Sequence, residues 1–249
     1  MASEPAPFDC NARIGTASQP HPAQFLDKAG LFAEWDRLGI GGGLVYHAWA
    51  QEWSPAEGNA RLEAEVAGET RLLPSFAALP GATRETAPPE EFAAHVRAQH
   101  GAVRLFPRTH SFELTPWCCG DLLGALEADQ VPVQVDIAET SWSDVAGVLA
   151  AFPRLHVIVL GVSYRADRVM YPLWEKHETL HIESCTYQVH RGIEAVCERF
   201  GAERIVFGTG LPVRDGGGAI AQIAYAEVSD EAKAAMAGGT MRGLLSFPL

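Results

Sequence analysis

Residues 131–163 read VPVQVDIAETSWSDVAGVLAAFPRLHVIVLGVS and contain one complete structural repeat. Residues 131–139 form a short apolar run typical of a buried strand, and residues 155–163 form a second one. Between them, residues 141–153 carry apolar side chains at helical spacing. Because a helical crossover returns the chain to the same end of a sheet, the two strands are expected to run parallel. The stretch therefore predicts a β-α-β unit.

The same alternation continues in both directions along the chain. The expected strands are residues 7–15, 42–48, 71–79, 102–107, 131–139, 155–163, 179–185 and 204–212. The expected helices are residues 22–39, 54–69, 89–101, 115–130, 141–153, 166–177 and 189–201, followed by 217–228 and 229–245. Eight such units without a linker favour an α/β fold of one domain, a single (β/α)8 TIM barrel over residues 1–249. An open dinucleotide-binding sheet would show Gly-x-Gly-x-x-Gly after its first strand, and none is present.

Composition argues against several classes of function. The chain has 19 Lys and Arg against 31 Asp and Glu, a formal net charge of −12. This balance argues against nucleic acid or an anionic membrane surface as a partner. Residues 1–10 show neither the basic nor the apolar segment of a secretory signal. The five cysteines form no Cys-x-x-Cys pair, which favours reduced thiols in a cytoplasmic protein.

Several segments resemble the amidohydrolase superfamily, specifically its amidohydrolase-related branch. Residues 7–15 resemble the opening strand Asp-x-His-x-His, and residues 131–139 resemble a fifth strand that ends Pro-Val-x-x-His. Residues 152–163 resemble a sixth strand that ends Leu-Gly-His, and residues 201–213 resemble the eighth strand Arg-Ile-x-Phe-Gly-Ser-Asp-x-Pro. The final stretch, residues 229–245, resembles the closing helix. The resemblance implies a TIM barrel in which a divalent metal activates water for hydrolysis.

This chain departs from the family pattern at every metal ligand that the resemblance implies. Asn11 and Arg13 stand at the two first-strand histidines, and Asp136 stands at the fifth-strand histidine. Val162 replaces the sixth-strand histidine, and Gly210 replaces the eighth-strand aspartate. Arg13 would put a permanent cation where the metal belongs, and Gly210 removes the base that activates water. We therefore expect a degenerate site with no metal and no cofactor.

Candidate site residues follow from the barrel, because active sites of this fold lie at the carboxyl ends of the strands. Asp136 and Glu183 are the candidate catalytic carboxylates, as a general base or, alternatively, as ion-paired structural acids. Arg13 and Arg104 are expected to face one pocket and hold a carboxylate or phosphate, unless Arg13 merely pairs with one of these acids. The candidate substrate-binding residues are Asn11, Arg13, His47, Arg104, His181 and Arg214.

Three further features admit two interpretations each. Residues 177–181 match the zinc motif His-Glu-x-x-His, but the pattern favours a chance match across a helix–strand junction. Residues 216–218 are three glycines at the start of a helix, and they form either an anion-binding site or a flexible connection. Trp49, Trp53 and Trp117 flank strand-end loops and form either an apolar lid or a contact in a homo-oligomer.

Three hypotheses about function follow. The preferred one is an amidohydrolase-like barrel with a degenerate metal site, which binds a small polar or anionic molecule and has metal-free hydrolysis or a related lyase step open to it. The second is a conventional metal-dependent hydrolase whose unusual ligands are Asp136, Glu183, His181 and Asn11. The third is a non-catalytic barrel that serves as a binding or assembly subunit.

Overall fold

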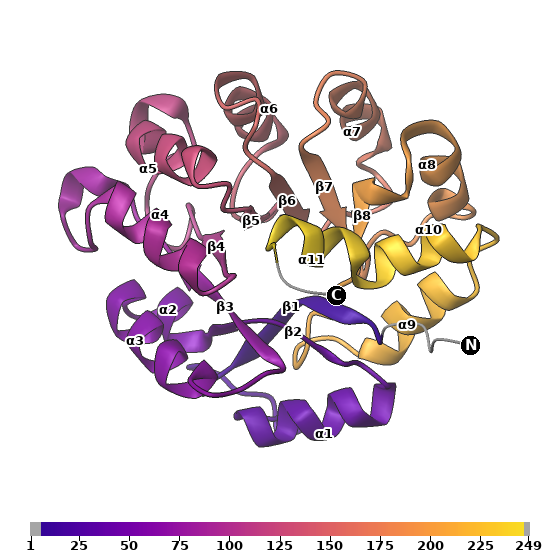
Figure 1. The fold of residues 1–249 in the computed structure, drawn as a ribbon, viewed down its shortest axis with the longest axis horizontal. Helices are drawn as coiled ribbons and strands as arrows, with labels where there is room; N and C mark the ends of the chain where they lie inside the picture. Colours follow the sequence, from indigo (N-terminus) through magenta and orange to yellow (C-terminus); the bar gives the residue numbers. More distant parts are fainter. Residues whose placement is uncertain (1–5, 247–249) are drawn as a thin grey trace.

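The structure is a computed structural model that describes residues 6–246. Eight parallel strands form one sheet in which each strand pairs with the next along the chain. Helices ring this sheet on the outside (Figure 1). The predicted single (β/α)8 TIM barrel is therefore confirmed. The strands are β1 (Phe8–Ile14), β2 (Gly42–His47), β3 (Leu72–Ala77), β4 (Ala102–Leu105), β5 (Val133–Asp136), β6 (Val157–Leu160), β7 (Leu180–Glu183) and β8 (Ile205–Val206).

Side-chain caps fix where several of the helices begin. The Asp27 carboxylate accepts a hydrogen bond from the Gly30 amide, so the first helix begins at residue 28 rather than at residue 22. Ser141 and Asp144 form a reciprocal capping box before α6. The helices are α1 (Lys28–Leu38), α2 (Ala48–Glu52), α3 (Pro55–Val66), α4 (Pro89–Ala98), α5 (Pro116–Ala128), α6 (Trp142–Ala151), α7 (Asp167–Trp174), α8 (Gly192–Phe200), α9 (Gly216–Ala224), α10 (Asp230–Ala234) and α11 (Thr240–Leu244).

Hydrogen bonds between β1 and the segment after β8 close the barrel. Three of them, each 2.9 Å long, run from the amides of Cys10, Gly210 and Arg13 to the carbonyls of Phe207, Asn11 and Leu211, respectively. Only Ile205–Val206 of the expected strand 204–212 pairs with β7 as regular strand. The remainder of that segment pairs with β1, and the ring of strands has no exposed edge at this point.

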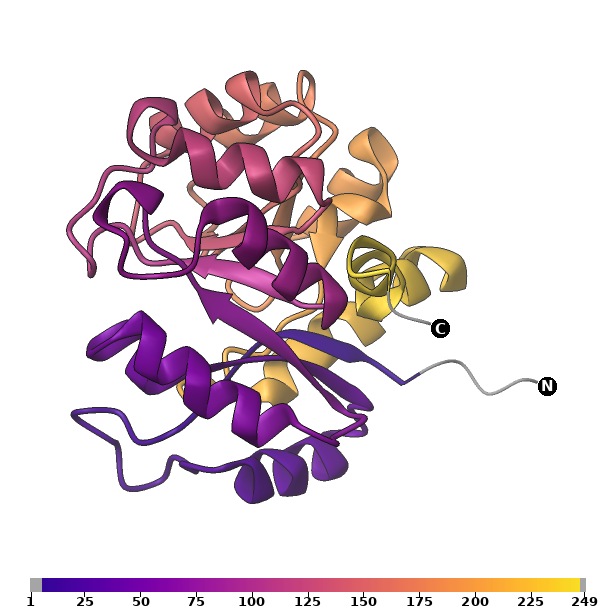
Figure 2. The same ribbon diagram turned by 60° about the vertical axis from the view of Figure 1, so that its left-hand side comes forward.

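Side chains alternate between the barrel interior and the helix layer, as strand geometry requires. The larger apolar cluster lies between strands and helices. A second cluster fills the amino-terminal half of the barrel interior with Phe8, Cys10, Leu44, Leu73, Ala102, Ile158, Leu160, Val206, Met241 and Leu245. Met241 belongs to α11, which lies across the end of the barrel opposite the strand arrowheads (Figure 2). This plug leaves the carboxyl-terminal end of the barrel for a binding site.

A bulge in β1 turns the second half of that strand toward the cavity. One extra residue of β1 shifts its pairing with β2 midway along the strand. As a result, Cys10 joins the inner apolar cluster, whereas Asn11 and Arg13 line the cavity at the carboxyl ends. The Gln134 amide reaches across the barrel and donates to the Cys10 carbonyl at 2.7 Å. This bond satisfies a buried carbonyl at the bulge.

Two stretches differ from the sequence-based expectation. The short helix α2 follows β2 directly, because the His47 ring nitrogen Nδ1 accepts a hydrogen bond from the Trp49 amide at 3.1 Å and caps it. The expected helix 229–245 is divided into α10 and α11 by a bend at Gly238, whose backbone is not helical. Throughout residues 6–246, every helix is too short or too polar to cross a membrane.

Asp9 is a fully buried carboxylate that joins β1 to the segment after β8 and to α1. It accepts hydrogen bonds from the Thr209 amide at 2.9 Å and the Thr209 hydroxyl at 2.5 Å. The Trp35 indole donates at 3.2 Å and the Asn11 amide at 2.9 Å. Burial raises the pKa of Asp9, and these hydrogen bonds act in the opposite direction. Four donors from three elements therefore depend on one carboxylate.

We predict that Asp9→Ala lowers the free energy of unfolding by about 3 kcal/mol or more, because buried donors left without an acceptor cost about 1–3 kcal/mol each. Urea denaturation followed by tryptophan fluorescence measures this change. Asp36→Ala is the matched control on α1, because Asp36 is 67% exposed and its ion pair with Arg71 contributes about 1 kcal/mol or less. Equal losses in the two variants would contradict the role assigned to Asp9.

Candidate functional site

A cavity of about 280 Å³ opens at the carboxyl ends of the strands. Its walls come from β1, β2, β4 and β5, from α2, and from the loops that follow β4, β5 and β8. The residues that line it are Asn11, Arg13, Tyr46, Gln51, Arg104, Phe106, Asp136, Ala138, Glu139, Gly210, Leu211, Val213 and Arg214. Five of the eight predicted site residues therefore meet in one place: Asn11, Arg13, Arg104, Asp136 and Arg214.

Arg104 of β4 is held in a fixed orientation within this cavity. It is only 6% exposed, and its Nη1 donates to Asn11 Oδ1 at 2.7 Å. Its guanidinium carbon lies 4.2 Å from the centre of the Tyr46 ring and 5.5 Å from that of Phe106, within cation–π range. Arg104 Nε is buried and has no hydrogen-bond partner. One donor edge of the guanidinium is therefore positioned but unused.

Arg13 of β1 is a second cation that lines the cavity. Its Nε is buried and also lacks a hydrogen-bond partner. Within residues 6–246, no carboxylate oxygen lies within 4.0 Å of a side-chain nitrogen of Arg13, Arg104 or Arg214. Arg13 is thus not neutralised by Asp136 or Glu183. A desolvated guanidinium without a partner is unfavourable, so this arrangement suits an anionic ligand.

Arg214 occupies space that the glycine at position 210 leaves free. A Cβ built on Gly210 would lie 2.9 Å from Arg214 Cδ and 3.2 Å from Arg214 Cγ. The backbone of Gly210 has φ +69°, a left-handed conformation that glycine adopts without strain. The absence of a side chain at residue 210 therefore allows the Arg214 side chain to lie against the backbone at the edge of the cavity.

Two carboxylates line the cavity, and both are held by groups other than the arginines. Asp136 Oδ1 accepts a hydrogen bond from the Ala138 amide at 2.8 Å. The Glu139 carboxylate accepts from the Thr109 amide at 2.8 Å and from the Thr109 hydroxyl at 2.7 Å. These bonds orient the acids and leave the guanidinium edges available.

Glu183 of β7 lies outside the residues that line the cavity, and it is completely buried. Neither carboxylate oxygen has a hydrogen-bond partner with acceptable geometry. Burial raises the pKa of Glu183, while nearby Cys185, Asn11 and Arg104 act in the opposite direction. Glu183 is therefore a buried acid whose neighbour Asn11 reaches the cavity wall.

Two predicted binding residues do not line this cavity. His47 caps α2 through its ring and packs edge-on against Trp49, with ring centres 6.1 Å apart. His181 Nε2 contacts His156 Nδ1 at 2.9 Å, and its Nδ1 contacts the Glu203 carbonyl at 2.7 Å. Since Glu203 precedes β8, this histidine pair lies toward the amino-terminal end of the barrel.

The remaining sequence features lie elsewhere. The motif at residues 177–181 falls between the end of α7 and the second residue of β7, so it does not lie on a helix. The amino terminus of α9 is capped from within, because Asp215 Oδ1 accepts from the Gly217 amide at 3.1 Å. Trp49 stacks on Trp53 with ring centres 4.6 Å apart, and these rings do not line the cavity.

The residues at the family's ligand positions do not fit a divalent metal. Asp136 is the only one of them with a carboxylate, and Arg13 points a cation into the same cavity. Val162 packs in the apolar cluster between strands and helices. Among residues 6–246, no group of three or more His, Cys, Asp or Glu side chains is arranged to hold a metal ion. The proposed alternative ligand set is not assembled either, since His181 lies toward the other end of the barrel from Asp136.

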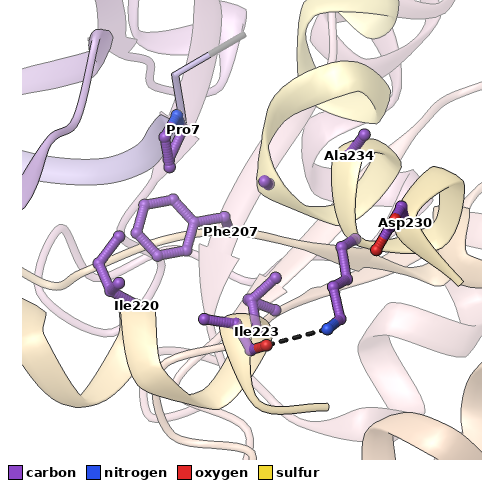
Figure 3. Close-up of a pocket in the computed structure, with 9 residues that line it drawn as sticks. Pro7, Phe207, Ile220, Ile223, Asp230 and Ala234 are labelled. Atoms are coloured by element: carbon purple, nitrogen blue, oxygen red, sulfur yellow. Dashed lines mark hydrogen bonds between the residues drawn. The ribbon is translucent and has the colours of Figure 1, made fainter. Parts of the chain in front are cut away.

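Another cavity, of about 340 Å³, lies against α9 and α10. Figure 3 shows Ile220 and Ile223 of α9 near Phe207, with Asp230 and Ala234 of α10 across the opening. Its lysine, Lys233, donates to the Ala224 carbonyl at 2.9 Å. The lining is mainly apolar and has no converging polar groups to orient a ligand. We therefore take the cavity at the strand carboxyl ends as the candidate site.

Among the contributors to the site wall that sequence reasoning missed are Tyr46, Phe106 and Glu139. Tyr46 could have been predicted from the alternation of side chains along β2. It shares the inner face of this strand with Leu44, whereas His47 points to the other face. Phe106 follows Arg104 with the same spacing and lies on the same face.

The chain is similar to known proteins in both sequence and fold. A family model described as Amidohydrolase matches residues 23–247. The structure resembles 5-carboxyvanillate decarboxylase from Sphingomonas paucimobilis at 14% identity, with a TM-score of 0.77 and coverage of 98% of this chain and 99% of that chain. It resembles 2,6-dihydroxybenzoate decarboxylase from Rhizobium at 15% identity, with a TM-score of 0.76 and coverage of 97% and 98%.

A third similar structure is a dihydroxybenzoic acid decarboxylase from Polaromonas sp. JS666, which contains manganese and the inhibitor 2-nitroresorcinol. It is 13% identical, with a TM-score of 0.69, and the match covers 97% of each chain. At these identities the structural likeness shows the fold alone. No curated protein matches the chain.

His181 generates a prediction about stability and pH. Burial lowers the pKa of His181 to about 3, with His156 acting in the same direction, whereas an unfolded histidine titrates near about 6.5. Its contribution to stability is complete above the unfolded value and is lost as pH falls from about 6.5 toward about 3. We expect His181→Asn to reduce the pH dependence of the free energy of unfolding by up to about 1.4 kcal/mol per pH unit in that window.

Urea denaturation at pH values between about 6.5 and 4.5 measures this difference against the unmutated protein. His190→Asn is the control, because His190 is exposed and forms no comparable histidine pair. A slope unchanged by His181→Asn would show that the buried pair does not control acid stability.

Proposed function

The chain belongs to the amidohydrolase family, and from that premise we propose that it binds a small carboxylate at the carboxyl-terminal face of its barrel, in a site that no longer holds the family metal. The observation that carries this proposal is the pair of buried, unpartnered Nε atoms on Arg13 and Arg104 in one cavity. A guanidinium presents two parallel N–H groups, which match the two oxygens of a carboxylate.

The energetics favour an anion over a neutral ligand. Hydrogen bonds that involve a charged group contribute about 1.5–3 kcal/mol each to stability, roughly twice the contribution of neutral ones. The cavity also restricts solvent around Arg104, which strengthens its interaction with an anion. The named substrates of two similar structures, 5-carboxyvanillate and 2,6-dihydroxybenzoate, are carboxylates, and this agrees with the proposal.

We infer a metal-free lyase or hydrolase step as the chemistry open to this site. Arg13 and Arg104 would bind and orient the carboxylate, and the Asp136 carboxylate, on the strand next to that of Arg104, would accept or return a proton as general base. Glu183, a completely buried acid whose pKa burial raises, lies next to Asn11. The competing hypothesis of a non-catalytic binding barrel shares the ligand site and differs only in turnover.

We predict that Arg104→Gln weakens carboxylate binding at least tenfold, because one charge-assisted pair of hydrogen bonds is lost. Isothermal titration with 2,6-dihydroxybenzoate as the probe measures the dissociation constant. Arg165→Gln is the control, since Arg165 is an exposed cation outside the cavity. Equal affinity in the two variants and the unmutated protein would remove the support for an arginine-based site.

We also predict that the purified protein retains no stoichiometric divalent metal after dialysis without chelator. A catalytic zinc site normally needs about three protein ligands, and the cavity supplies the carboxylates of Asp136 and Glu139 beside three arginines. Elemental analysis, combined with zinc or manganese addition to assays of ester, amide and lactone hydrolysis and of decarboxylation, measures this. About one metal per chain, with activity abolished by a chelator, would instead favour the conventional hydrolase.

A further inference from the structure

A polar cavity of about 260 Å³ lies at the amino-terminal end of the barrel, opposite the candidate site. Its walls come from the carboxyl-terminal ends of α4, α5 and α11 and from the segment between α6 and β6. Helix α11 crosses this end of the barrel (Figure 2). None of the residues that line this cavity belongs to the candidate site.

Hydrogen bonds fix the tautomers of two histidines beside this cavity. The Glu203 carbonyl can only accept, so His181 Nδ1 donates to it at 2.7 Å. Burial lowers the pKa values of His181 and His156, so both rings are neutral and each has one donor and one acceptor nitrogen. His181 Nε2 therefore accepts, and His156 Nδ1 donates to it at 2.9 Å. The remaining acceptor of the pair is His156 Nε2.

His156 Nε2 is within reach of a ligand in the cavity. His156 is half-buried and lines the cavity, and its Nε2 forms no hydrogen bond within residues 6–246. This nitrogen is not one of the buried atoms that lack a partner, so it is open to solvent. This wall therefore favours a ligand that donates a hydrogen bond.

Arg97 and Ser246 contribute hydrogen-bond donors to the same cavity. Arg97 Nη1 donates to the Gln130 carbonyl at 3.3 Å and Arg97 Nη2 to the Ser246 hydroxyl oxygen at 2.8 Å, which holds the guanidinium in place. Because Ser246 Oγ accepts this bond, its own hydrogen is available to donate. Within residues 6–246, no carboxylate oxygen lies within 4.0 Å of a side-chain nitrogen of Arg97.

Glu127 is the only acid among the described residues that line this cavity, and it is already bound. Its Oε1 accepts from the Arg154 amide at 2.8 Å, and its Oε2 accepts from Arg154 Nη2 at 3.3 Å. The charges of Glu127 and Arg154 offset each other. Arg97 therefore gives the cavity a positive charge, which suits an anion.

We propose that this cavity binds inorganic phosphate, with its oxygens held by Arg97 and Ser246 and its O–H group donated to His156 Nε2. At neutral pH, inorganic phosphate combines negative charge with at least one O–H group, so it matches both kinds of partner. Sulfate is also a tetrahedral anion but has no O–H group. The cavity volume is several times the roughly 30 Å³ that one water molecule occupies in the liquid, so the ion fits together with some of its water.

Isothermal titration with phosphate and sulfate as a matched pair tests the proposal. We expect phosphate to bind at least tenfold more tightly than sulfate, because sulfate leaves His156 Nε2 without a donor. Methyl phosphate distinguishes free phosphate from a phosphate ester. At about pH 7.5 it is mostly a dianion without an O–H group, since the second pKa of such esters is about 6, and it should bind no more tightly than sulfate.

Two substitutions test the assigned partners. His156→Phe keeps a ring but removes the acceptor, and it should reduce the preference for phosphate over sulfate to about twofold or less. Arg97→Gln should weaken the binding of both ions at least tenfold. Arg168→Gln is the control, because Arg168 is an exposed cation of α7 that does not line this cavity, and it should retain both affinities. Thermal melting shows that each variant is folded, and His156→Asn serves as a second variant should His156→Phe not fold.

The contrary outcomes are distinct from those that bear on the proposed function. Equal affinity of the unmutated protein for phosphate and sulfate, or for phosphate and methyl phosphate, would overturn the role of His156. Loss of phosphate binding in Arg104→Gln but not in Arg97→Gln would place the ion in the candidate site and overturn the second site. No phosphate binding by the folded protein would also overturn it and would leave carboxylate binding at the other end of the barrel intact.

Discussion

The Asp9 carboxylate accepts hydrogen bonds from β1, from α1 and from the segment after β8, and the placement of the candidate site depends on this contact. Asn11 and Arg13 follow Asp9 on β1, and Gly210 follows Thr209 on the other side of the joint. The hydrogen bond from the Gly210 amide to the Asn11 carbonyl then holds β1 beside the segment after β8. The contacts that close the barrel therefore also position Asn11, Arg13 and Gly210 at the cavity.

Arginines take the place that a divalent cation occupies in the family pattern. Both arrangements create positive potential at the carboxyl ends of the strands, which suits an anionic ligand. They differ in chemistry, because a guanidinium binds and orients oxygens but does not generate hydroxide from water as a bound metal does. Asp136, which stands at the family's fifth-strand histidine, together with the cations at Arg13 and Arg104, thus fits proton transfer to or from a bound carboxylate better than hydrolysis by activated water.

The barrel was predictable from sequence because eight periodic units leave few alternatives, and the family pattern placed Asn11, Arg13 and Asp136 on inner strand positions. The sequence did not indicate the bulge in β1, which depends on pairing with β2 and on the bond from Gln134 across the barrel. The sequence also did not show that His181 and Glu183, which share one face of β7, lie at different positions along the barrel axis. The alternation of side chains along a strand predicts which face of the strand a side chain lies on. Its position along the barrel axis depends instead on how far neighbouring strands are shifted relative to one another.

Two glycines at the carboxyl ends of the strands are coupled to side chains of the cavity. A side chain at residue 210 would meet the methylenes of Arg214, and a left-handed φ of +69° there adds strain for any residue but glycine. Gly161 has a similar constraint, because a Cβ built on it would lie 2.6 Å from Asp136 Oδ1. Each glycine thus leaves space for a polar side chain that faces the cavity. An aspartate at residue 210 would therefore displace the Arg214 side chain without completing a metal site.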